Sequence, residues 1–259
     1  MTTIHYYKSP KVLLNELGIT EPQDIRIEGI AQYCGATIMY ESLTGCEARI
    51  LGLGDQAFIT IRKESSRERQ RFSAGHELGH WMRDRGKLAF HCAGTDFTRE
   101  WQTENPEKRA NRYATDLLLP DFMFTPRAKN RPITFASVEA LAKDFSTSLT
   151  ATAIRLVELG SFPAMIVCSS LQGRCWFIRG EDVPSFLYPV EKPDRDSLAY
   201  ALLAGGSRNG PTTVYADTWI NHRDAHRYKL IEDSRKVSGE VVITLLWWEN
   251  EQQLLDLTR

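Results

Sequence analysis

The residues with the clearest chemistry are the two histidines and the glutamate in the run His76-Glu77-Leu78-Gly79-His80. On a helix, side chains four residues apart lie on one face, so His76 and His80 would converge on one point. Zn²⁺ binds imidazole nitrogens at about 2.0–2.1 Å in a tetrahedron, and two such nitrogens supply two of its corners. Glu77 points around the same side and can accept a proton from a water molecule that the metal polarises. The pattern therefore predicts a metal site with a carboxylate base beside it.

The sequence around this motif predicts a helix without reference to the motif itself. Ser65 and Glu68 have the spacing of a capping box, which favours a long helix over residues 67–84. Gly75 and Gly79 remove side-chain bulk where a strand or a substrate backbone must approach. Apolar side chains indicate that the helix is packed rather than solvated: Phe72, Leu78, Trp81 and Met82.

A third ligand has to come from another part of the chain, and Glu107 is the favoured residue. Asn105-Pro106 resembles a helix start, with proline at the first helical position, which places Glu107 in the first turn. Asn111 follows one turn later on the same face. A carboxylate ligand with a polar partner four residues on is the layout of glutamate-liganded zincins, in which the partner orients a metal-bound histidine.

Three other residues remain alternatives for the third ligand. His91 and Asp96 lie in the stretch 86–104, which has a loop-like sequence, and Glu104 precedes the proline that begins the next helix. A histidine six residues after His80 is excluded, because that position is Gly86.

Composition excludes several classes of protein. The 259 residues are 42% apolar and 25% charged, as in ordinary globular proteins, and the net charge of −1 predicts no general attraction to nucleic acid or anionic membranes. Five scattered cysteines without a C-x-x-C pair indicate reduced thiols in a cytoplasm rather than a disulfide scaffold. The polar N-terminus is unlike a secretory signal, and no stretch approaches the roughly 18 apolar residues of a membrane span.

Periodicity predicts an α+β fold whose first half contains a small sheet and several helices. Strand patterns occupy 37–40, 48–53 and 57–62, and helix patterns occupy 9–17, 26–34, 67–84 and about 105–119. Two more helices, 137–145 and 149–159, flank a tight turn. After Pro163 the pattern is mainly that of strands, at 165–168, 174–178, 212–216, 228–232 and 240–248, with one helix near 197–204.

Two blocks of sequence resemble the ImmA/IrrE family of metallopeptidases. Residues 69–80, RQRFSAGHELGH, are similar to the family's R-x-R-F-[ST]-x-x-H-E-x-x-H helix. Residues 107–120, EKRANRYATDLLLP, are similar to its E-x-x-A-[ND]-x-[FY]-A block and the following L-x-x-P. The resemblance is strong over about residues 50–120, and Gly75 is a departure, since a larger residue is usual there.

The resemblance implies a domain order as well as a site. It implies a zincin-like peptidase core at 1–130, a helix-turn-helix-like segment at 131–160, and a GAF-like sensor domain with an α/β sheet at 161–259. It also implies His76, His80 and Glu107 as ligands of Zn²⁺, with Mn²⁺ as an alternative metal, and Glu77 as the general base.

What the resemblance implies about function is a zinc-dependent endopeptidase of the cytoplasm. Family members typically cleave an XRE-type transcriptional repressor and so release stress-response or mobile-element genes. We expect the substrate to bind in an extended form, paired with the sheet edge near 56–62.

Two alternatives come from other classes of protein. The first is a non-proteolytic zinc-containing regulator that binds a repressor or a toxin. The second is direct DNA binding through 137–160, which the sequence disfavours because the only basic residues there are Lys143 and Arg155. His222 and His226 are also four residues apart, and we interpret them as part of a solvated loop.

Overall fold

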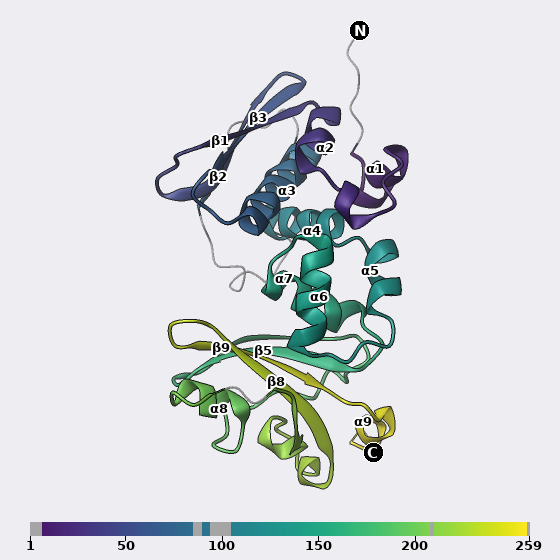
Figure 1. Ribbon diagram of the computed structural model, residues 1–259, viewed down its shortest axis with the longest axis vertical. Helices are drawn as coiled ribbons and strands as arrows, with labels where there is room; N and C mark the ends of the chain where they lie inside the picture. The colour runs from purple at the N-terminus through teal and green to yellow at the C-terminus, as the bar shows by residue number, and fades with distance from the viewer. Residues whose placement is uncertain (1–6, 85–89, 94–104, 208–209, 258–259) are drawn as a thin grey trace. The chain divides into compact units, whose positions relative to one another are not determined.

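The computed structural model describes residues 7–84, 90–93, 105–207 and 210–257, which form two compact units (Figure 1). The N-terminal unit comprises Met1–Phe124 and Ala142–Ser148, and the C-terminal unit comprises Thr125–Leu141 and Leu149–Arg259. Each unit contains one β-sheet together with helices, which confirms the predicted α+β class. The predicted helix-turn-helix-like segment contributes residues to both units, and the zincin-like and GAF-like descriptions remain predictions.

The sheet of the N-terminal unit has four strands in the order β1-β3-β2-β4. The strands are β1 (Ala36–Glu41), β2 (Cys46–Leu53), β3 (Gln56–Arg62) and β4 (Phe90–Ala93). β1 runs parallel to β3, whereas β2 runs antiparallel to both β3 and β4.

This order makes one sequence-based expectation wrong. β3 pairs with a strand on each side, so the stretch near 56–62 is not a free edge to which a substrate could add. In the sequence β2 and β3 are consecutive strand patterns, which suggests that they pair. Nothing in the sequence indicates that β1 pairs with the other edge of β3.

Strand β4 corrects a second expectation, because it lies in the stretch 86–104 that was expected to be a loop. Phe90 pairs with Ile50 and His91 with Arg49, so the ladder to β2 holds the backbone of this short segment. Four residues are too few for a periodic pattern, and the strand depends on its partner.

Helix α3 (Arg67–Asp84) packs on β2 and β3 and has the predicted bounds. Ile59 and Ile61 alternate onto a fully buried face of β3, and Ile50 pairs with Ile59 on the same face. The residue that caps the helix is Ser66 rather than Ser65: the Ser66 hydroxyl oxygen accepts a hydrogen bond from the Arg69 backbone N–H at 3.3 Å.

The remaining helices of the N-terminal half follow in order along the chain. They are α1 (Pro10–Glu16), the 3₁₀ turn η1 (Pro22–Asp24), α2 (Ile27–Tyr33), α4 (Pro106–Leu118), α5 (Asp121–Ala128), α6 (Phe135–Phe145) and α7 (Leu149–Leu159). The predicted helices at 105–119, 137–145 and 149–159 are confirmed. α5 was not predicted, and it contains Pro126, which is normally a helix breaker.

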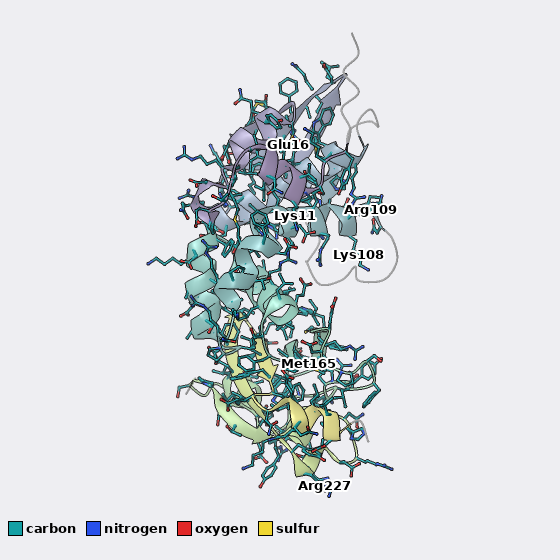
Figure 2. The ribbon with its side chains drawn as sticks, turned by 90° about the vertical axis from the view of Figure 1, so that its right-hand side faces the viewer. Lys11, Glu16, Lys108, Arg109, Met165 and Arg227 are labelled. Carbon is teal, nitrogen blue, oxygen red and sulfur yellow. The ribbon has the colours of Figure 1, made fainter. Side chains whose placement is uncertain are left out.

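The C-terminal unit contains a five-stranded antiparallel sheet in the order β6-β5-β9-β8-β7. Its elements are β5 (Ala164–Ser170), β6 (Gly173–Arg179), α8 (Leu198–Leu203), β7 (Thr212–Tyr215), η2 (Ala216–Thr218), η3 (Ala225–Arg227), β8 (Lys229–Ser238), β9 (Val241–Trp247) and α9 (Glu251–Asp256). Met165 on β5 belongs to the buried core with Trp219 and Trp248, whereas Arg227 reaches the surface (Figure 2).

Strand β8 continues past Glu232, where the sequence predicted its end. Its polar side chains accept hydrogen bonds from backbone N–H groups in the first turns of two helices. Glu232 Oε1 accepts a hydrogen bond from the backbone N–H of Ala199 in α8 at 3.0 Å. Asp233 Oδ2 accepts one from the N–H of Phe135, the first residue of α6, at 2.7 Å. Both carboxylates are fully buried, so residues that look like a strand end in the sequence lie inside the unit.

No helix among the described residues is long and apolar enough to cross a bilayer.

Burial of Glu232 gives a test of this part of the fold. Burial raises the pKa of Glu232 above the usual 4.5, although hydrogen bonds from the Ala199 backbone N–H and the Ser234 hydroxyl oppose the shift. A raised folded-state pKa contributes stability that is complete below pH 4.5 and is lost as pH rises through the folded-state value. Relative to Glu232→Gln, the wild-type free energy of unfolding should therefore decline from pH 4.5 upward in urea titrations.

The exposed Glu181→Gln is the matched control and should leave the pH dependence unchanged. Parallel pH curves for wild type and Glu232→Gln would show that the carboxyl group is not shifted.

Candidate metal centre

Helix α3 brings the two motif histidines together as predicted. The Nε2 atoms of His76 and His80 lie 3.1 Å apart. Their side chains are 11% and 2% exposed, so both imidazoles are largely removed from water. An uninterrupted helix over 67–84 is what aligns them, since residues four apart project from one face.

Glu107 joins this pair from α4. Its Oε2 lies 3.1 Å from His76 Nε2, and its Oε1 lies 3.3 Å from His80 Nε2. Asn105 caps α4 by accepting a hydrogen bond from the Glu107 N–H at 3.2 Å, which fixes the first turn that carries the carboxylate. His76, His80 and Glu107 thus form a candidate metal-binding cluster with one ligand atom from each residue.

Two glycines allow α4 to approach α3 this closely. A Cβ on Gly79 would lie 2.9 Å from Tyr113 Cβ and 3.1 Å from Ala110 Cα. A Cβ on Gly75 would lie 3.3 Å from Ala114 Cβ. The glycines were expected to admit a strand or a substrate backbone, but the element that they admit is the helix that carries Glu107.

Asn111 contacts His76 on the side away from the cluster. The Asn111 Oδ1 lies 2.8 Å from His76 Nδ1, and because an amide oxygen only accepts, Nδ1 carries the proton. In the neutral ring, the form that binds a metal ion, Nε2 therefore keeps its lone pair and faces His80 and Glu107; in the protonated ring Nε2 donates a hydrogen bond to Glu107. This arrangement agrees with the orienting role expected for Asn111.

Glu77 lies beside the cluster and is fully buried. Its charge is close enough to His76 to favour the protonated form of the imidazole. A carboxylate in a site with little water interacts strongly with neighbouring charges, because the effective dielectric constant is low.

The charges of the cluster depend on one another. Burial lowers the pKa of His76, but the hydrogen bond to Glu107 and the charges of Glu77 and Glu107 raise it by more, so the net shift is upward. Hydrogen bonds from His76 and His80 hold the pKa of Glu107 far below its usual range. The carboxylate of Glu107 is therefore ionised at neutral pH, as a metal ligand must be.

The spacing of the two histidine nitrogens fits a tetrahedral metal ion. A tetrahedron with bonds of about 2.0–2.1 Å has edges of about 3.3–3.4 Å. The Nε2–Nε2 separation of 3.1 Å is close to this value, and each nitrogen lies within 3.3 Å of one oxygen of Glu107. Two imidazoles with a carboxylate are a donor set typical of zinc. Three protein ligands leave one position open, as in catalytic rather than structural zinc sites.

Three other residues were considered as the third ligand in place of Glu107. The His91 side chain, Asp96 and Glu104 lie outside the described residues. His222 and His226 are described and belong to no metal-binding cluster there; His226 Nδ1 lies 3.0 Å from the carbonyl oxygen of Arg223.

Comparison with known proteins agrees with this geometry. The peptidase family model described as the IrrE N-terminal-like domain matches residues 31–157, a range that includes α3 and α4. A solved structure described as a Mycobacterium tuberculosis transcriptional regulator is similar at a TM-score of 0.56 and 12% identity, over 92% of this chain and 73% of that chain. At such identity the likeness shows the fold alone. No curated protein matches the sequence.

The contact between the helices predicts different outcomes for the two glycines. Gly79→Ala places a methyl group against the backbone of Ala110, which cannot move aside, so we expect a loss of about 1–3 kcal/mol of stability and weaker zinc binding. Gly75→Ala has no contact shorter than 3.3 Å, to Ala114 Cβ, with Ala114 Cα at 3.4 Å, so a small shift relieves it and the change should be nearly neutral. Chemical denaturation and zinc titration of both variants would measure this, and equal effects would contradict the proposed contact.

The raised pKa of His76 predicts how metal affinity depends on pH. The imidazole must lose its proton to bind a metal ion, and a raised pKa makes this competition begin at higher pH. We expect zinc affinity to begin falling at a pH above the usual imidazole value of 6.5 as pH decreases, by about tenfold per unit for one competing proton. Equilibrium dialysis against buffered zinc would measure the slope, and constant affinity between about pH 5 and 7 would exclude His76 as a ligand.

Proposed function

We propose that this chain, which belongs to the ImmA/IrrE family through its IrrE N-terminal-like domain at residues 31–157, is a zinc-dependent endopeptidase. The observation that carries the proposal is the convergence of His76, His80 and Glu107 on one point beside the carboxylate of Glu77. A structural zinc site has no need of a base next to its ligands, whereas peptide hydrolysis requires one.

In this proposal His76, His80 and Glu107 hold the metal ion. When bound, the ion supplies Lewis-acid chemistry, polarising the attacking water and the substrate carbonyl group. Glu77 accepts a proton from the attacking water and can return it to the nitrogen of the departing peptide. Asn111 keeps the His76 ring in the tautomer and orientation that binding requires.

The substrate that we propose is an XRE-type transcriptional repressor whose cleavage switches on stress-response or mobile-element genes. The family membership supports this choice. An extended substrate that pairs with the sheet has to use one of its outer strands, β1 or β4, because β3 is paired on both sides.

Zn²⁺ is the metal that we propose, and Mn²⁺ is the alternative, because two imidazoles and a carboxylate accept both ions. We place the reaction in the cytoplasm. Cys34, Cys46, Cys168 and Cys175 are free thiols, which supports a reducing compartment.

Direct DNA binding through α6 and α7 has less support. Arg155, one of the two basic residues of 137–160, is 2% exposed and pairs with Glu158 at 3.2 Å. A buried and paired guanidinium is not available to a phosphate group.

Replacing the proposed base separates catalysis from metal binding. Glu77→Gln should keep one zinc ion per chain and lose cleavage by a factor of at least about 10²–10⁴, because the amide cannot accept the proton. The assay would follow fragments of an XRE-type repressor encoded beside the gene by mass spectrometry, with metal content measured on the same sample. Glu68→Gln, the same change on the same helix away from the site, is the matched control.

Cleavage by Glu77→Gln at the wild-type rate would show that the base is another residue. A stable complex of wild type with the repressor and no fragments, with or without chelator, would instead identify a regulator that acts by binding.

A further inference from the structure

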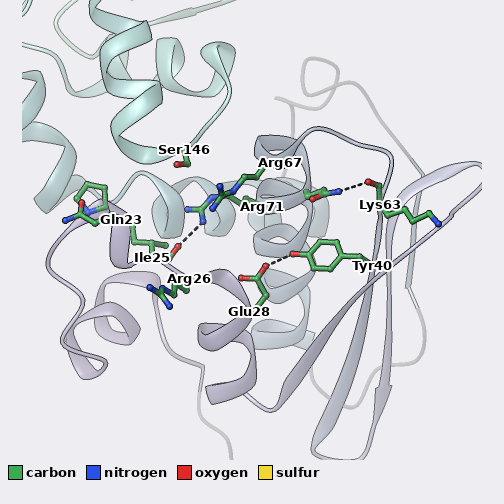
Figure 3. A pocket seen from close by; sticks show the side chains of 11 residues that line it. Gln23, Ile25, Arg26, Glu28, Tyr40, Lys63, Arg67, Arg71 and Ser146 are labelled. Carbon is green, nitrogen blue, oxygen red and sulfur yellow. Dashed lines mark hydrogen bonds between the residues drawn. The ribbon is translucent and has the colours of Figure 1, made fainter.

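A cavity of about 810 Å³ lies within the N-terminal unit, beside the first turns of α3 (Figure 3). Its lining comes from the segment around η1 and α2, from β1, from α3 and from the turn after α6: Pro22, Gln23, Ile25, Arg26, Glu28, Tyr40, Lys63, Arg67, Gln70, Arg71 and Ser146. Four of these residues are cationic and one is a carboxylate. The cavity is therefore strongly basic, in a chain whose net charge is −1.

Arg67 and Arg71 are the central pair of this lining. They are four residues apart on α3, so their side chains lie on the same face, and Figure 3 shows their guanidinium groups close together. Like charges at this spacing destabilise a helix. Arg67 is also the first residue of α3, at the positive end of the helix dipole, where an anion rather than a cation is favoured.

Within the described residues, carboxylates act on Arg71 only from beyond ion-pair distance. Among the described residues, no carboxylate lies within the 4.0 Å of an ion pair from Arg67 or Arg71. Arg71 donates one hydrogen bond, from Nη1 to the Ile25 carbonyl oxygen at 2.9 Å, and its Nε is buried without a partner. Burial and the charge of Arg67 lower the pKa of Arg71, although Glu28 and Glu68 act in the opposite direction. Partly buried arginines normally have a counter-ion at contact distance, and Arg71, which is partly buried, has none among the described residues.

The other lining residues indicate what kind of anion would fit. The Glu28 carboxylate accepts a hydrogen bond from the Tyr40 hydroxyl at 2.5 Å, so it is held against Tyr40. Pro22, Ile25 and the Tyr40 ring provide apolar surface next to the charges. Arg26 adds positive charge at the rim, whereas the Lys63 side chain points away from the arginines (Figure 3).

We propose that this cavity is a binding site for a phosphate-bearing small molecule, whose phosphate group lies between Arg67 and Arg71. Guanidinium forks match phosphate oxygens with paired, charge-assisted hydrogen bonds. The volume is in the range of small-molecule sites, about 300–1,000 Å³, and exceeds the volume of a bare phosphate ion. The apolar wall would contact the organic part of the ligand.

The site is separate from the metal centre but shares its helix. Arg71 precedes His76 by five residues, which is about 7.5 Å along the axis and about 140° around it. A ligand held by Arg67 and Arg71 would therefore not touch the metal ligands. It would stabilise the first turns of the helix that carries them.

Isothermal titration of the zinc-loaded full chain tests the site, with inorganic phosphate, AMP and adenosine as probes. We expect saturable binding of phosphate, tighter binding of AMP, and none of adenosine, which lacks the charged group. Arg67→Gln should weaken AMP binding about ten- to hundredfold, the loss expected for charge-assisted hydrogen bonds. Arg67 is exposed, so this variant should fold normally, and Arg71→Lys tests whether the planar fork is needed.

Arg69→Gln is the matched control, because it removes the same charge from the same helix outside the cavity, and it should bind AMP as wild type does. The proposal is overturned if neither phosphate nor AMP binds below about 10 mM, or if Arg67→Gln and Arg69→Gln weaken binding equally. Tighter binding of succinate than of phosphate would assign the cavity to carboxylates instead. Much tighter arginine-dependent binding of a ten-nucleotide single strand would assign it to a nucleic-acid backbone.

Discussion

Helix α4 lies against α3 at a distance that only small residues permit, and the candidate metal centre depends on this contact. Gly79 faces the backbone of Ala110, so the first turn of α4 carries Glu107 to within 3.3 Å of both histidine nitrogens. The same approach places Asn111 against His76. One packing constraint therefore positions both Glu107 and Asn111, the residue that contacts His76. Moving α4 away by the width of one methyl group would disturb both contacts.

Helix α3 connects two sites with opposite electrostatics. Its middle carries the two imidazoles, which lie next to the carboxylates of Glu77 and Glu107. Its first turns carry Arg67 and Arg71, which lack a carboxylate partner within the described part of the chain. Carboxylates thus lie within 3.3 Å of the imidazoles at the candidate metal centre, whereas at the cavity the Glu28 carboxylate acts on Arg71 only from beyond ion-pair distance. Because one helix holds both groups, a ligand bound at either of the proposed sites would stabilise the element on which the other site depends.

Much of the fold could be predicted because local signals agree with the tertiary structure. The bounds of α3 follow from its serine start and continuous helical pattern, and Asn105-Pro106 begins α4 as expected. The predictions that were missing or wrong concern segments held by distant partners. The short strand β4 depends on its ladder to β2, and β8 extends through Glu232 and Asp233 because these carboxylates bind the N–H groups of Ala199 and Phe135. In the sequence alone, charged residues such as Glu232 and Asp233 indicate the end of a strand, because their hydrogen-bond partners lie far away in the chain.

The ligand types, the candidate base and the 3.6-residue period that places His76 and His80 on one face can all be read from the sequence. It also indicated Glu107 and Asn111, since a capped helix start fixes their relative positions. Only the tertiary structure decided that Glu107 reaches both histidines, that Gly75 and Gly79 admit a helix, and that β3 is paired on both sides. It alone brought η1, β1 and the turn after α6 around Arg67 and Arg71. The difference lies in separation along the sequence. Helix periodicity and capping act over a few residues, whereas these contacts join segments that lie far apart in the chain.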